Sequence, residues 1–212
     1  LKKKMENYTH YLKPLLSFRY SPNGNNDLSS KNVFLNYNSA FDINRIGSTS
    51  QVEGGESLTM GLEFKRNNNE GTNIFDFNIA NVLKHNEDYR MPTKSKLNNK
   101  RSDIFGNFNY NIDDNIKFKY FFSYDKDLKY SNLDQFGLDF SVNNFFTNIS
   151  YYSEHNDLPE VESIKNTSRF SFDNENKITF KVSRDLNDNF TEYYDLIFSH
   201  ETDCIALLLN FN

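Results

Sequence analysis

Polar and apolar residues alternate along most of this chain. The stretch 116–125 reads IKFKYFFSYD, and it separates cleanly into two sets. The apolar set consists of Ile116, Phe118, Tyr120, Phe122 and Tyr124, and the polar set of Lys117, Lys119, Ser123 and Asp125. Successive side chains of a β-strand point to opposite faces of the sheet. The stretch therefore predicts a strand with one apolar face and one polar face.

The same period of two recurs throughout the sequence. It is found again at 12–20, 57–65, 75–79, 103–110, 135–142, 145–151, 170–172, 177–183, 194–198 and 205–211. No stretch has a convincing helical period. No apolar run approaches the roughly 20 residues that a membrane-spanning helix needs. We therefore expect an all-β chain of about 11–12 antiparallel strands.

The connections between these strands alternate in length. Short turns are predicted at 67–72, 112–115, 143–144, 174–176 and 201–203, and longer connections at 83–101, 126–131, 154–165 and 186–189. Outer-membrane barrels have short periplasmic turns and longer external loops. The pattern predicts an antiparallel up-and-down transmembrane β-barrel, of which this chain forms a part.

Residues 21–56 fit the pattern less well. Val33, Leu35 and Tyr37 could form a further strand, but that strand would upset the up-and-down order. We interpret the region as one long external connection.

A soluble β-barrel or sandwich is the competing fold, because its strands are also amphipathic and turn their apolar side inward. Strands of about ten residues and connections sorted by length favour the membrane barrel. Tyrosines near several strand ends, which suit the membrane interface, favour it as well: Tyr20, Tyr110, Tyr124 and Tyr151.

The composition agrees with a sheet and argues against disorder. Only 37% of the residues are hydrophobic and the mean hydropathy is −0.76, yet aromatic residues reach 16%. Disordered chains are poor in aromatic and β-branched residues. The net charge is −5 and the basic residues form no stripe, so we expect no nucleic-acid partner.

The sequence predicts no enzyme. The four histidines (His10, His85, His155 and His200) are dispersed, and none has a partner at metal-ligand spacing. No nucleophile motif accompanies them, although a serine could still lie beside one of them in space. We therefore assign no catalytic residue, no cofactor and no metal.

The single cysteine, Cys204, directly follows the short turn 201–203. The order of the turns places it at the periplasmic edge of its strand. The periplasm is oxidising, so a lone cysteine there suggests a disulfide partner elsewhere. A free, half-buried thiol is an equally good interpretation of the sequence.

Several segments resemble the barrel domain of the LPS-assembly protein LptD family, also called the organic-solvent-tolerance protein family. They are His10–Pro14 with 15–22, Asn44–Gly47, 51–55 leading into Ser57–Leu62, Tyr193–Leu196 and Thr202–Ile205. Ile46, Gln51, Val52 and Glu56 depart from the family pattern. The residues that match it are Pro14, Asn44, Arg45, Gly47, Glu53, Gly54, Gly55, Gly61, Asp203 and Cys204.

The resemblance implies a function in the bacterial outer membrane. Barrels of this family receive lipopolysaccharide from a periplasmic bridge protein (LptA-like), hold a plug lipoprotein (LptE-like) and insert lipopolysaccharide into the outer leaflet. Cys204 would then form a disulfide with a periplasmic jellyroll domain. We expect residues 1–212 to be part of one barrel domain, with that jellyroll and the first and last barrel strands outside it. A general porin or adhesin, or a soluble lipid-binding β-barrel, is the alternative.

Overall fold

The computed structural model describes residues 1–22, 24, 26–47, 53–155 and 160–211. Within these residues, twelve antiparallel strands form one sheet, and each strand is hydrogen-bonded to the next one in the chain. This confirms the predicted all-β, up-and-down arrangement of a partial barrel. The three-residue strand β1 (Lys2–Lys4) was not predicted, because a run of lysines shows no alternation.

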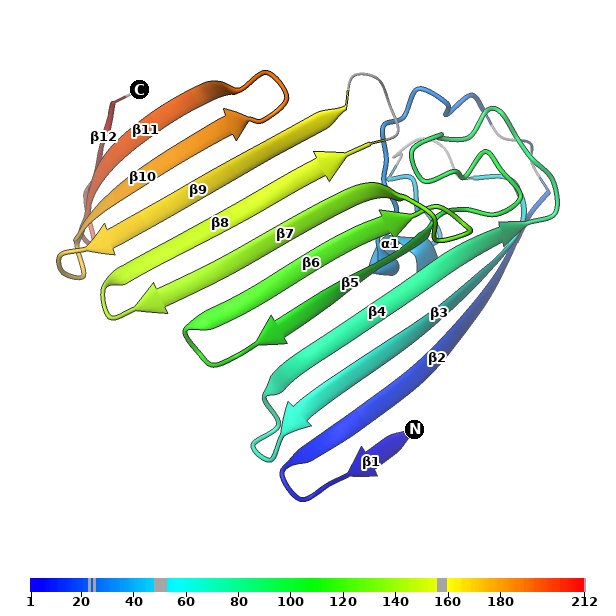
Figure 1. Cartoon of the computed structure of the whole chain (residues 1–212), viewed down its shortest axis with the longest axis horizontal. Coiled ribbons are helices and arrows are strands. Elements are labelled where there is room, and N and C mark those ends of the chain that lie inside the picture. The colour runs from blue at the N-terminus through cyan, green and yellow to red at the C-terminus, as the bar shows by residue number, and fades with distance from the viewer. Residues whose placement is uncertain (23, 25, 48–52, 156–159, 212) are drawn as a thin grey trace. The chain divides into compact units, whose positions relative to one another are not determined.

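The chain divides into two compact units, which we describe separately. Unit 1 comprises residues 1–109 and 121–133, and unit 2 comprises 110–120 and 134–212. Unit 1 contains β1, β2 (Tyr8–Ser21), β3 (Gly55–Asn68) and β4 (Asn73–Lys84). Both units share β5 (Ile104–Asn111), β6 (Ile116–Tyr124) and β7 (Ser131–Val142). Unit 2 contains β8 (Phe145–Glu154), β9 (Val161–Ser171), β10 (Asn176–Asp185), β11 (Phe190–Glu201) and β12 (Ala206–Phe211), all labelled in Figure 1.

The strands of unit 1 have the two faces that the alternation predicted. On the apolar face, Leu16 and Phe18 of β2 are 71% and 69% exposed. Leu16 lies opposite Met60 of β3, which is also exposed. Such rows of exposed apolar side chains are unfavourable in water but suit contact with lipid.

The connection between β2 and β3 covers the other face of unit 1. Its described part has no strand and one short helix, α1 (Tyr37–Phe41), which starts at an Asn36–Ser39 capping box. The helix lies against β3 and β4 (Figure 1). Thr59 donates a hydrogen bond from Oγ1 to the Ala40 carbonyl at 3.3 Å. A Cβ on Gly61 would be only 2.7 Å from the Phe41 ring, so this glycine gives the helix room.

This helix is part of a buried apolar cluster on the nominally polar face of unit 1. The connection between β4 and β5 joins it: the Leu35 N–H donates to Ser95 Oγ, and the Leu28 N–H to the Arg90 carbonyl, both at 2.6 Å. The sheet contributes small or apolar residues where this face was predicted to be polar. The buried members are Leu28, Leu35, Tyr37, Ala40, Ile46, Ala80, Val82, Met91, Leu97 and Phe105.

Unit 2 also has a polar and an apolar face. On its polar face, Asp139 accepts a hydrogen bond from Asn148 at 2.6 Å and forms an ion pair with Lys119 at 2.7 Å. On its apolar face, the rings of Tyr120 and Phe136 stack with their centroids 4.4 Å apart.

A polar cluster interrupts the apolar face of β8 and β9. The hydroxyls of Thr147 and Ser168 lie 2.9 Å apart, and Asn166 donates to Thr147 Oγ1 at 2.9 Å. Ser168 in turn donates to Asn166 Oδ1 at 3.0 Å. The three side chains satisfy one another, which lowers the cost of placing them on an otherwise apolar face.

The predicted connections hold with one change. Strand β9 begins at Val161, so the connection after β8 is shorter than the predicted 154–165. Residues 156–159 of that connection lie outside the described part. Among the described residues, no helix is long and apolar enough to cross a membrane.

Two strand glycines allow a test of this packing. A Cβ on Gly106 would meet the Asn78 carbonyl oxygen at 2.2 Å and the Phe122 ring at 2.7 Å. A Cβ on Gly137 would lie 3.7 Å from Lys119 Cβ, an ordinary contact. Gly106→Ala should therefore destabilise the protein by about 1–3 kcal/mol, as overpacking usually does.

The measurement is the temperature at which the folded band of the full-length protein disappears on semi-native gel electrophoresis. Gly137→Ala is the matched control and should melt like the wild type. Equal melting of the two variants would contradict the close approach of β4 and β5 at Gly106.

Candidate functional site

A buried ion pair lies where the connection between β2 and β3 returns to the sheet. Glu53 is 2% exposed and Arg45 is 3% exposed. Arg45 binds both carboxylate oxygens of Glu53, through Nε to Oε2 at 2.5 Å and through Nη2 to Oε1 at 2.8 Å. This two-point geometry is the strongest that a guanidinium and a carboxylate can form.

Three adjacent strands surround this pair with polar groups. Arg19 of β2, Ser57 of β3 and Lys84 of β4 lie in one row, because Ser57 is in register with both cations. Arg19 forms an ion pair with Glu53 and donates from Nη1 to the Ile43 carbonyl at 2.8 Å. Lys84 Nζ lies 3.7 Å from Glu53 Oε1 and donates to the Leu97 carbonyl at 3.0 Å.

Arg45 completes the attachment of the loop to β3. It donates to Ser57 Oγ at 2.7 Å and approaches Thr59 Oγ1 at 3.2 Å. The cluster of Arg19, Arg45, Glu53 and Lys84, here called the Glu53 cluster, thus ties both long connections to three strands. Its three cations outnumber its single carboxylate.

Glu53 is held in its charged form. Burial alone would raise its pKa, but the Arg45 hydrogen bonds and the charges of Arg45, Arg19 and Lys84 outweigh burial, and the pKa lies below its ordinary value. The stabilisation from this carboxylate is present above its ordinary pKa and is lost as the pH falls through the lowered one.

Asp103, which ends the connection between β4 and β5, behaves in the opposite way. It is 1% exposed and accepts hydrogen bonds from Asn132 Nδ2 at 2.6 Å and Ser123 Oγ at 3.1 Å. Burial dominates over these donors and raises the pKa of Asp103 from 3.8 to about 6. The folded protein therefore binds a proton here more tightly than the unfolded chain.

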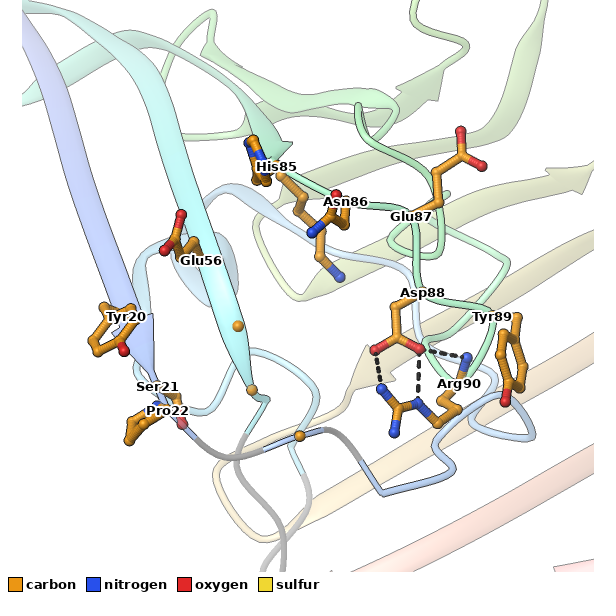
Figure 2. A pocket seen from close by; sticks show the side chains of 14 residues that line it. Tyr20, Ser21, Pro22, Glu56, His85, Asn86, Glu87, Asp88, Tyr89 and Arg90 are labelled. Atoms are coloured by element: carbon orange, nitrogen blue, oxygen red, sulfur yellow. Dashed lines mark hydrogen bonds and ion pairs between the residues drawn. The ribbon is translucent and has the colours of Figure 1, made fainter.

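A cavity of about 560 Å³ opens beside the Glu53 cluster. Figure 2 shows the end of β2 (Tyr20 and Ser21) with the following Pro22 on one side of it and the segment 85–90 on the other. Asp88 accepts hydrogen bonds from Arg90 Nε at 2.9 Å and Nη2 at 3.0 Å. Lys84 belongs both to the lining and to the Glu53 cluster, so the two features are contiguous.

Several residues of the predicted motif meet at this place. Arg45 and Glu53 form the ion pair, and Gly54 and Gly55 line the cavity. Gly55 has φ +80°, a backbone conformation that favours glycine at the start of β3. Gln51 and Val52 of the motif lie outside the described residues.

The other motif residues have different surroundings. Gly47 has φ +70° and closes a turn by donating from its N–H to the Asn44 carbonyl at 3.2 Å. Pro14 lies in β2 opposite Leu62. Asp203 and Cys204 lie in unit 2, in the turn after β11, where Cys204 is exposed.

Arg19 and Lys84 were not predicted as site residues. In the sequence, each of them is only a cation on the polar side of an amphipathic strand, and many other residues of this chain share that feature. Only the register of three strands identifies their common partner.

Within the described part of the chain, the histidines have no recognisable catalytic partners. His155 Nε2 lies 2.7 Å from Ser153 Oγ, but Ser153 is only 1% exposed. His200 Nδ1 lies 2.9 Å from Asn176 Oδ1. Across the described ranges, no group of three or more His, Cys, Asp or Glu residues is placed to hold a metal ion.

Comparison with protein families identifies most of this chain. A family model described as "LptD: LPS transport system D" matches residues 1–190. No curated protein matches the chain.

Replacing Glu53 tests whether its cluster holds the long connections on the sheet. Glu53→Gln leaves three buried or half-buried cations without their carboxylate partner. Removing one partner of a buried ion pair typically lowers the free energy of unfolding by about 3–5 kcal/mol. We expect the connections 22–54 and 85–103 to become cleavable when the full-length protein is treated with protease. Glu201→Gln, which removes an exposed ion pair with Lys177, is the control and should leave cleavage unchanged.

The raised pKa of Asp103 predicts a specific pH dependence. Its stabilising contribution is fully present below about pH 4 and is lost as the pH rises through about 6. Asp103→Asn keeps an acceptor for Ser123 and Asn132 but does not titrate. As the pH is raised from about 4 to above 6, the wild type loses this contribution and the variant does not. The free energy of unfolding of the variant should therefore rise by about 2–3 kcal/mol relative to that of the wild type. Urea unfolding at several pH values measures this difference. If the free energies of unfolding of the two proteins changed in parallel with pH, the raised pKa of Asp103 would be refuted.

Proposed function

The chain belongs to the LptD family, LPS transport system D, and from this membership we propose that it is the outer-membrane translocon component that inserts lipopolysaccharide into the outer leaflet. The family acts in lipopolysaccharide transport at the outer membrane. The observation that carries the proposal is the match over residues 1–190, which covers all of unit 1 and unit 2 as far as residue 190.

The two faces of the sheet support this proposal. We assign the apolar face, with Leu16, Phe18 and Met60, to the lipids of the outer membrane. We assign the polar face, with pairs such as Lys119–Asp139, to the lumen. A polar lumen would pass the sugars of lipopolysaccharide, while the acyl chains would leave sideways into the membrane. No chemical step is needed, and the protein would not be an enzyme.

The connections suggest an orientation. With the short turns on the periplasmic side, the connections 22–54 and 85–103 lie at the external end of the barrel. Because they fold over the polar face, they would narrow the exit of the lumen. Substrate would enter from a periplasmic LptA-like bridge protein, and an LptE-like lipoprotein would plug the lumen.

Cys204 fits the same orientation. It is exposed in a short turn, where a cysteine of another domain can reach it. We propose that residues 1–212 belong to one outer-membrane barrel domain and that Cys204 forms a disulfide with a periplasmic domain of the full-length protein.

Depleting the full-length protein tests the function. We expect lipopolysaccharide to disappear from the cell surface and to accumulate in the inner membrane, and a plasmid-borne copy should restore it. Unchanged surface lipopolysaccharide would rule the proposal out.

A planar-bilayer recording separates this function from that of a general porin. The covered polar face of unit 1 predicts low steady ion conductance for the full-length protein in complex with its plug. Large, continuously open conductance would favour a porin instead, and recovery of the protein in the soluble cell fraction would exclude both.

A further inference from the structure

The cavity beside the Glu53 cluster has the composition of a sugar-binding site. We propose that it binds an uncharged oligosaccharide segment, namely sugars of lipopolysaccharide that have reached the external end of the barrel. The identity of these sugars rests on the proposed function, whereas the binding of an oligosaccharide rests on the cavity alone.

The polar groups in the lining of the cavity favour a sugar over an acyl chain as its ligand. Its volume of about 560 Å³ lies within the 300–1,000 Å³ range of ligand pockets and is large enough for a short oligosaccharide. Glu56, Asn86 and Glu87 are among the residues that line it, and covering them with an apolar ligand would remove them from water without supplying new hydrogen bonds.

Two tyrosines supply surfaces for the flat faces of sugar rings. Tyr20 ends β2 and is 62% exposed, and Tyr89 lies in the connection after β4 and is 85% exposed. Figure 2 shows them on opposite sides of the cavity. The electron-rich face of an aromatic ring attracts the weakly positive C–H groups of a sugar.

The groups between the two rings suit hydroxyls. Glu56, Asn86 and Glu87 line the cavity and provide several acceptors together with an amide donor. A sugar hydroxyl both donates and accepts, so it can satisfy such a mixed set.

The charges disfavour a phosphate. Arg90 is engaged by Asp88, and Lys84 by the Leu97 carbonyl and Glu53. The carboxylates of Glu56 and Glu87 also line the cavity and would repel an anion. An uncharged sugar segment therefore fits better than a phosphorylated one.

The test is binding of lipid-free oligosaccharide to the full-length protein in nanodiscs, measured by calorimetry. One probe is a neutral saccharide fragment from the outer sugars of lipopolysaccharide, and the other is maltotriose, a free neutral glycan. The wild type should bind the lipopolysaccharide fragment more tightly than maltotriose. Tyr20→Ala combined with Tyr89→Ala should weaken binding about tenfold, a change of about 1.4 kcal/mol, because both stacking surfaces are lost.

Matched variants make the result specific. Tyr130→Ala removes a tyrosine that is 55% exposed in the connection after β6, outside the cavity lining, and should bind like the wild type. Glu87→Leu removes acceptors without touching either ring and should also weaken binding. Each variant is first compared with the wild type for protease resistance, which shows that its loops are folded.

Three outcomes overturn all or part of the proposal. If the wild type binds neither probe, or if the tyrosine variant binds as tightly as the wild type, the cavity is no sugar site. Equal affinity for both probes would support an oligosaccharide site but refute the proposal that its ligand is a segment of lipopolysaccharide. The depletion experiment is independent of these results, so failure of the transport function would be recognised separately.

Discussion

Backbone pairing is the constraint on which this structure depends. In an apolar surrounding no water is available for a free N–H or C=O group, so each strand must be hydrogen-bonded to its neighbours along its length. Adjacent strands then divide their side chains between two faces, and the polarity of the surroundings decides which residues each face carries. The register of β2 with β3 illustrates this, since it runs without a break from Tyr8 to Ser21.

The long connections obey a different constraint. They cover part of the sheet with apolar residues, yet they also bring a carboxylate into the interior. A buried carboxylate is costly unless cations and donors surround it. Glu53 meets this requirement with Arg45 from its own loop and with Arg19 and Lys84 from two strands. Lys84 of this cluster also lines the cavity, so the two features share a residue.

The sequence predicts the sheet better than it predicts the loops. Alternation is a local property, and stretches such as 116–125 contain all that is needed to identify a strand. Helix α1 has five residues, too few for a helical period, and only its capping residues mark it. Arg45 and Glu53 could be singled out by the family pattern. Their partners Arg19 and Lys84 could not, because their proximity arises from strand register and not from spacing along the chain.

Pairing of each strand with its sequence neighbour also has a kinetic consequence. Contacts between adjacent strands close short loops, so the sheet can grow hairpin by hairpin at small entropic cost. The loop cluster instead joins segments such as Leu35 and Ser95, which are 60 residues apart. Several of its contacts involve β3 and β4 as well. We therefore expect the end of the polar face that carries these connections to close late in assembly, after the strands that support it.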